Sequence, residues 1–203
     1  SPMLDLEKKV FKNVLPFGLV YNGKTYQQSC LAIGKRVILV NAHAFNSIED
    51  RFEVDGKTYH LDDVDVCVLD TSEGLSDVCA VKLPPGPDFP SVVRLFMPFH
   101  ADLHPGLRLT ILSNDQLPMM REGSFLRNED YAPTNIGNIP FVCLYRSTSY
   151  FGMCGSPVMT RGPDSQGILG IHCAGGGGVS VLSRVTRRMA ESVIDYFYPL
   201  QTQ

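Results

Sequence analysis

Residues 167–183 read GILGIHCAGGGGVSVLS, and this stretch indicates more about the fold than any other in the chain. Two short apolar runs flank four consecutive glycines, which is typical of two strands joined by a tight turn. A phosphate-binding loop would need a Lys and a Ser or Thr opening a helix after the glycines, but VSVLS follows them here. The stretch therefore predicts a β-hairpin.

Strand-like runs of the same kind recur along the chain, separated by Asn-Gly, Asp-Gly and Pro-Gly pairs. They include PFGLVY (16–21), RVILV (36–40), VDVCVL (64–69), VCAVKL (78–83), LRLTIL (107–112) and FVCLYR (141–146). The 18 glycines and 14 prolines are spread along the 203 residues, which favours many short elements. No self-similar period of about 20 to 50 residues is visible, which disfavours propellers and solenoids. The sequence predicts an all-β fold of the sandwich or barrel type.

Two amphipathic helices are expected to bracket the β-rich region. Apolar residues recur at spacings of three and four over residues 3–14, and at a spacing of four over 185–197. The proline-rich stretch LPPGPDFP (83–90) is the largest break in the strand pattern. We therefore predict two domains, residues 1–90 with the leading helix and residues 91–203 with the terminal helix.

Composition and charge disfavour several classes of function. The formal net charge of −3 gives no global positive field that would attract nucleic acid or an anionic membrane. No apolar run approaches the roughly 18 residues that a membrane span needs, and the opening SPMLDLEKKV does not look like a signal peptide. We expect a chain that is not secreted and does not insert into membranes.

Cys154 differs from the other five cysteines in its surroundings. Those five lie mostly in apolar runs and are expected to be small buried hydrophobes: Cys30, Cys67, Cys79, Cys143 and Cys173. Cys154 lies in the turn-like segment Gly152-Met153-Cys154-Gly155-Ser156. There the N–H groups of Gly152 and Cys154 can converge on one point, so we predict an oxyanion hole in the segment from Gly152 through Met153 to Cys154. A buried cysteine in a glycine-flanked turn is the alternative interpretation.

His43 and Asp77 are the residues that could activate this cysteine. His43 follows the strand-like run RVILVNA and could take the thiol proton, because a thiolate beside an imidazolium is a better nucleophile than a thiol. Asp77 could accept the second ring N–H of His43 and fix its tautomer. Taken alone, a histidine in this position is more often a capping or surface residue, and an aspartate at a strand start usually serves turn chemistry. The order His43, Asp77, Cys154 is that of chymotrypsin-like enzymes, whereas subtilisin-like and α/β-hydrolase enzymes use other orders.

His172 is a candidate for substrate recognition. It lies eighteen residues after Cys154, on a strand that would form one wall of a primary specificity pocket. A neutral imidazole there can donate a hydrogen bond to a carboxamide oxygen, and the hydroxyls of Thr148 and Ser149 could supply another donor. We expect His172 to stay neutral, because an imidazolium would be costly to bury. An ordinary core histidine is the alternative.

Taken together, these motifs resemble the picornavirus 3C cysteine proteases, particularly those of the hepatovirus and parechovirus kind. The resemblance spans nearly the whole chain and rests on KNVLPFGLV (12–20), His43, SDVCAVKLP (76–84), GMCG (152–155), GIHCAGG (170–176) and the terminal helix. It implies a chymotrypsin-like fold of two β-barrels, the first carrying His43 and Asp77 and the second carrying Cys154 and His172. It also implies a cysteine endopeptidase that processes the viral polyprotein by cutting after glutamine, read by His172 and a hydroxyl near Ser149.

The resemblance further implies partners and a location. The sequence also raises doubt about two of the family's features. The viral polyprotein is the expected substrate, with host proteins as further targets and the host-cell cytoplasm as the location. Gln203 ends the sequence, as a product of cutting after glutamine would. In some relatives the matching aspartate does not engage the histidine, which leaves the role of Asp77 open. The family's RNA-binding motif, Lys-Phe-Arg-Asp-Ile, appears as DFPSV (88–92) without its basic residues, so only weak binding of viral RNA is expected.

We expect neither a metal nor a cofactor. His100 and His104 have a spacing that would suit metal ligands on a helix, but Pro105 and the lack of a third nearby ligand oppose a site. Two other functional classes are disfavoured. A noncatalytic RNA-binding module of a viral replication complex is opposed by the acidic charge balance. A cellular serine-protease relative with cysteine in place of serine is opposed by the lack of a secretory signal.

Overall fold

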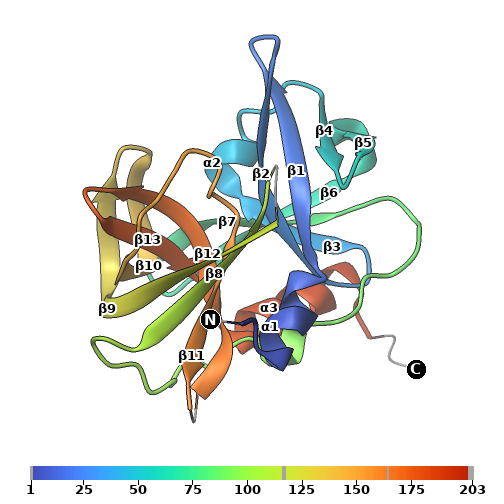
Figure 1. The fold of residues 1–203 in the computed structure, drawn as a ribbon. Coiled ribbons are helices and arrows are strands. Elements are labelled where there is room, and N and C mark those ends of the chain that lie inside the picture. The colour runs from blue at the N-terminus through green and yellow to red at the C-terminus, as the bar shows by residue number, and fades with distance from the viewer. Residues whose placement is uncertain (1, 116–117, 164, 201–203) are drawn as a thin grey trace.

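Two β-sheets dominate the structure, a computed structural model that describes residues 2–115, 118–163 and 165–200 (Figure 1). The first sheet has seven strands in the order β5-β4-β1-β2-β3-β7-β6, and the second is a closed barrel in the order β10-β13-β12-β11-β8-β9. This arrangement agrees with the predicted all-β fold of two barrel-like units. Gln203 lies outside the described residues.

The first sheet contains the strands of the chain's first half. They are β1 (Val14–Tyr21), β2 (Lys24–Gly34), β3 (Val37–Asn41), β4 (Arg51–Val54), β5 (Lys57–His60), β6 (Asp65–Thr71) and β7 (Gly74–Lys82). All five residues of β3 are buried, because this strand pairs with β2 on one side and with β7 on the other. An apolar run on both faces fits a central strand. It leads directly into α2 (Ala42–Phe45), which carries His43.

The second sheet contains the strands of the second half. They are β8 (Arg108–Asn114), β9 (Pro118–Thr134), β10 (Gly137–Arg146), β11 (Pro157–Gly162), β12 (Ser165–Gly176) and β13 (Val179–Arg184). The hairpin predicted for residues 167–183 is confirmed, since β12 and β13 pair antiparallel. Gly177 and Gly178 have φ of +63° and +83°, the left-handed pair that the tightest hairpin turns need.

The connection between the sheets runs from the end of β7 to the start of β8 and contains only the short 3₁₀ helix η2 (Val93–Leu95). The proline-rich break lies within it. The largest apolar core lies between the two sheets: Leu31 and Leu39 of the first sheet belong to one buried cluster with Leu112 and Ile171 of the second. Both sheets therefore depend on a shared interior, and the domain boundary at residue 90 stays a prediction.

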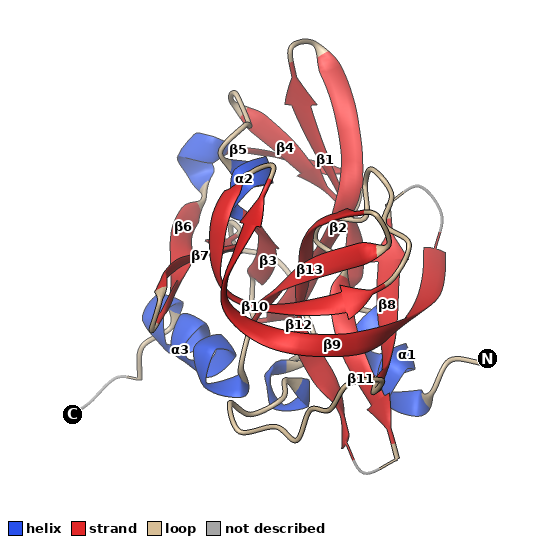
Figure 2. Cartoon of the chain, turned by 90° about the vertical axis from the view of Figure 1, so that its left-hand side faces the viewer, coloured by secondary structure: helices blue, strands red, loops and turns tan. Residues whose placement is uncertain are grey.

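Each terminal helix packs against the sheet that is distant from it in sequence. Glu7 of α1 (Asp5–Phe11) is buried, accepts a hydrogen bond from the Thr110 hydroxyl of β8 (2.7 Å) and pairs with Arg161 of β11 (3.1 Å). The helix α3 (Arg187–Phe197) contacts β6 and η2. Figure 2 shows α1 and α3 on opposite sides of the molecule. The two helices thus help to hold the sheets together.

The leading helix is shorter than the apolar spacing predicts. It ends at Phe11, and Val14 opens β1 instead of continuing the helix. Pro16 disfavours a helical conformation for the residue before it, which turns the chain into a strand. In the part of the chain that the structure describes, no helix has both the length and the apolar character of a membrane span.

Candidate active site

The structure brings His43 and Asp77 together through neighbouring strands. Asn41 of β3 pairs with Val78 of β7, which places the start of α2 beside Asp77. The Asp77 carboxylate accepts hydrogen bonds from the His43 backbone N–H (2.9 Å) and from Nδ1 of its ring (2.6 Å). A carboxylate can only accept, so Nδ1 carries a proton and Nε2 faces the groove. The sequence left this engagement open, and in the structure the contact is made.

The charge state of His43 is set by two opposing effects. Burial disfavours the charged ring, but the hydrogen bond with Asp77 and the proximity of Cys154 outweigh it and raise the pKa of His43 to about 10. The imidazolium is therefore favoured at neutral pH. The Cys154 thiol itself donates to the Cys173 carbonyl (3.6 Å). A positive ring held by a carboxylate beside a thiol is the environment that makes a thiolate available for attack.

The loop that carries Cys154 is held by the first sheet and by β12. Cys154 lies between β10 and β11, and its carbonyl accepts a hydrogen bond from the Ser29 N–H of β2 (3.3 Å). The Gly155 N–H donates to the His172 carbonyl (3.1 Å). Gly155 has φ of +85°, and a Cβ there would lie 1.8 Å from the Ser29 carbonyl oxygen, so no other residue fits.

One of the three backbone N–H groups predicted for the oxyanion hole already has a partner within the turn. The Met153 N–H donates to the Tyr150 carbonyl (3.1 Å), so it is already used, and Met153 contributes to the turn rather than to anion binding. Among the hydrogen bonds between described residues, neither the Gly152 N–H nor the Cys154 N–H is a donor. Gly152 has φ of +103°, which glycine adopts at little cost.

His172 lies on β12 at the other side of Cys154 and is only 2% exposed. Burial, together with the positive charge of His43, lowers the pKa of His172 to about 4, so the ring is neutral as expected. Its Nδ1 lies 2.6 Å from the Tyr145 hydroxyl of β10. Burial raises the pKa of Tyr145 well above its ordinary value, so this hydroxyl keeps its proton.

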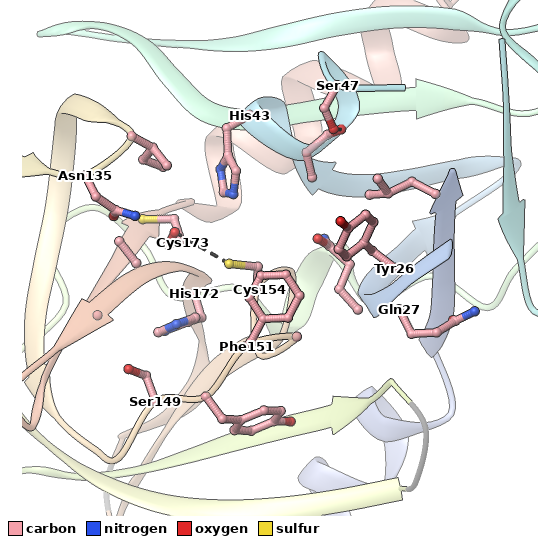
Figure 3. A pocket seen from close by; sticks show the side chains of 18 of the residues that line it. Tyr26, Gln27, His43, Ser47, Asn135, Ser149, Phe151, Cys154, His172 and Cys173 are labelled. Carbon is pink, nitrogen blue, oxygen red and sulfur yellow. Dashed lines mark hydrogen bonds between the residues drawn. The ribbon is translucent and has the colours of Figure 1, made fainter. Parts of the chain in front are cut away.

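Several of the predicted site residues border one groove of about 680 Å³ between the two sheets (Figure 3). His43, Cys154, His172 and Ser149 all border it. Ser149 lies so close to β12 that a Cβ on Gly175 would come within 2.4 Å of its Oγ. Thr148 is exposed and does not line the groove, so of the two hydroxyls expected near His172 only Ser149 is in place.

Several residues at the site were not predicted from the sequence. Tyr145 lies in the strand-like run FVCLYR. A tyrosine buried in such a strand needs a partner for its hydroxyl, and this need is the signal that could have identified it. Tyr26 of β2 and Phe151 of the Cys154 loop also line the groove, with their rings in edge contact at 5.9 Å. Phe151 is 86% exposed, and a large exposed aromatic beside Cys154 suits contact with a ligand.

Other sequence-predicted features lie away from this groove. Phe89 of the DFPSV segment forms an isolated bridge with Lys35, and a second cavity there is bordered by Asp88, Arg94 and Asp195. Its mixed charges give no continuous basic surface for phosphates. Within the described ranges, no group of three or more His, Cys, Asp or Glu side chains gathers as a metal site would require.

The sequence profile of the 3C cysteine protease (picornain 3C) family matches residues 1–177. The chain is 65% identical to part of the genome polyprotein of Cosavirus A and 31% identical to part of that of encephalomyocarditis virus, over 98% of this chain in both cases. It spans about 9% of the length of these polyproteins. The finer resemblance to hepatovirus and parechovirus enzymes stays a prediction.

Solved structures share the fold at low sequence identity. The HRV-C 3C protein bound to rupintrivir has a TM-score of 0.71 at 16% identity, over 91% of this chain and 98% of that one. Tobacco etch virus protease in complex with its product has a TM-score of 0.70 at 14% identity, over 97% and 82% of the two chains. With the family match, these findings lead to one conclusion: the chain belongs to the 3C cysteine protease (picornain 3C) family and is a cysteine endopeptidase with a chymotrypsin-like fold.

Proposed function

We propose that this chain processes the viral polyprotein by cutting after glutamine, with Cys154 as nucleophile and His43 as the general base. One observation carries the proposal: a charged histidine beside a cysteine, and a neutral, buried histidine on its other side, border the same groove. The first pair suits covalent attack on a carbonyl, and the second histidine suits recognition of an uncharged polar side chain.

The proposed reaction forms and then hydrolyses a thioester. Cys154 Sγ, having given its proton to Nε2 of His43, attacks the carbonyl carbon of the residue before the cut. The N–H groups of Gly152 and Cys154 stabilise the oxyanion. The imidazolium returns the proton to the departing amine as the C–N bond breaks, which leaves an acyl group on Sγ. Water then attacks the thioester and gives a proton to His43, and the free carboxylic acid leaves as the thiol reforms.

Glutamine is favoured by the way Tyr145 fixes the His172 ring. The protonated Tyr145 hydroxyl can donate to Nδ1 of His172, which leaves the ring proton on Nε2. Nε2–H then donates to the carboxamide oxygen of glutamine, and the Ser149 hydroxyl adds a second polar contact. A glutamate carboxylate would need desolvation in this pocket without a positive partner, because His172 is neutral.

A peptide panel tests the assignment of His172. Peptides that differ only in having glutamine, glutamate or leucine before the cut are compared by kcat/KM, and we expect the native enzyme to prefer glutamine by about 100-fold or more. His172→Phe keeps a buried ring but has no donor, so its preference for glutamine over leucine should fall to within about tenfold.

Tyr145→Phe serves as the matched variant, because it removes only the hydroxyl that fixes the His172 tautomer. We expect an intermediate loss of glutamine preference, with melting temperatures measured for every variant to exclude unfolding. Equal native rates on glutamine and leucine peptides would refute the pocket assignment. Binding of viral RNA, action on host proteins and a location in the host cytoplasm stay predictions.

A further inference from the structure

We propose that Asn41 is a positioning residue, which aligns the Cys154 loop with His43 by a side-chain hydrogen bond between the two sheets. This inference rests on the proposed catalytic roles of Cys154 and His43. Asn41 is fully buried at the end of β3, two residues before His43. Its Nδ2 donates to the carbonyl of His172 at 3.0 Å, a contact between residues 131 positions apart in the chain.

The side chain of Asn41 does not make the capping hydrogen bond that its position at the start of α2 would predict. Asn41 is the N-cap of α2, where an asparagine normally accepts a hydrogen bond from the first turn. No such capping bond forms here. Instead the Gln28 side chain of β2 donates from Nε2 to Asn41 Oδ1 at 3.0 Å, which orients the amide so that its nitrogen faces His172. The amide is therefore committed to the contact between the sheets.

The His172 carbonyl connects this contact to the nucleophile. The same oxygen accepts the Gly155 N–H (3.1 Å), and Gly155 follows Cys154 directly. The backbone of Asn41 meanwhile pairs with Val78, beside Asp77. Asn41 thus holds His43 and Asp77 in place through its backbone, and it holds the Cys154 loop in place through its side chain. A misplacement of about 1 Å between reacting groups can cost on the order of 100-fold in rate.

The test replaces Asn41 by leucine, which has nearly the same size and carries no charge and no donor. We expect kcat to fall by about tenfold to hundredfold with KM changed by less than about threefold. The rate at which iodoacetamide alkylates Cys154 should fall with kcat, because this small reagent reports the readiness of the thiol without substrate binding.

Asn13→Leu is the control, since Asn13 is equally buried and donates to the carbonyls of Ala32 and Pro90 (2.9 and 2.7 Å), away from the groove. It should lower the melting temperature by at least as much as Asn41→Leu, while kcat and the alkylation rate stay within about twofold of native. Gln28→Met, which frees the Asn41 amide without removing it, should give a smaller kcat loss that is not additive with Asn41→Leu.

Two results would overturn the proposal: an Asn41→Leu enzyme with kcat within twofold of native, or an Asn13→Leu enzyme that loses as much kcat. If Asn41→Leu does not fold, the Gln28→Met variant provides the test instead. An unchanged kcat and an unchanged alkylation rate in that variant would contradict the proposal. These outcomes differ from a failure of the catalytic assignment, which would show as undiminished cleavage by a Cys154→Ala variant.

Discussion

Replacing Cys154 by alanine is expected to leave a folded protein whose kcat is below about one ten-thousandth of the native value. The substitution removes the sulfur that becomes acylated in the proposed mechanism, and loss of a nucleophile costs at least this much in comparable enzymes. Initial rates on a glutamine peptide, measured at enzyme concentrations high enough to detect residual activity, provide the test. The melting temperature shows whether the fold is kept.

Cys67→Ala is the matched control for this experiment. Cys67 is a free cysteine on β6, partly exposed and absent from the groove. Its removal should leave kcat within about twofold of native. If the Cys154→Ala protein cut the peptide at the native rate, the nucleophile would have to be another group, and the proposed mechanism would be wrong.

Asp77→Asn is expected to lower kcat on the order of 1000-fold. The carboxylate accepts both the backbone N–H and the Nδ1–H of His43, whereas a carboxamide has only one accepting atom. The amide nitrogen would then face one of these two donors, so the ring would lose its anchor or adopt the wrong tautomer. Rates for Asp77→Asn and for Asp70→Asn, an exposed aspartate on β6, are compared at one pH.

The same pair of variants tests whether the Asp77 carboxylate raises the pKa of His43. The imidazolium must donate a proton to the leaving amine, so activity is lost as the pH rises through the pKa of His43, near 10 in the native enzyme. Because Asp77 favours the charged ring, its neutralisation should lower that pKa and move the alkaline limb of kcat/KM to lower pH. An unshifted limb in Asp77→Asn would show that the carboxylate does not hold the charge.

The all-β architecture could be predicted from local sequence. Strand-like runs and the glycine turn at 175–178 are short-range signals, and β12 and β13 pair as they indicate. The apolar spacing predicts too late an end for the first helix, because it continues through Val14 while Pro16 already favours a strand. The apolar spacing alone could not reveal whether residues 12–14 continue the helix or turn into the strand that Pro16 favours.

The supporting contacts of the site could not be predicted in the same way. Tyr145 meets His172, and Asn41 meets the His172 carbonyl, only because the barrel closes and the two sheets pack together. Thr148 and Ser149 are adjacent and chemically alike, yet only Ser149 faces the groove. Which of the two does so depends on the path of a loop without regular structure, for which sequence periodicity gives no signal.

In the proposed mechanism, the Cys154 thiol becomes acylated by the part of the substrate that ends in glutamine. The direct measurement is the intact mass of the enzyme, quenched in acid during turnover of a peptide ester ending in glutamine, followed by mapping of the modified residue. An activated ester makes acylation fast relative to hydrolysis of the thioester. We predict an adduct with the mass of the acyl segment on Cys154 alone, and none in the Cys154→Ala protein. Turnover with an adduct on another residue, or with no adduct at any time, would contradict the mechanism.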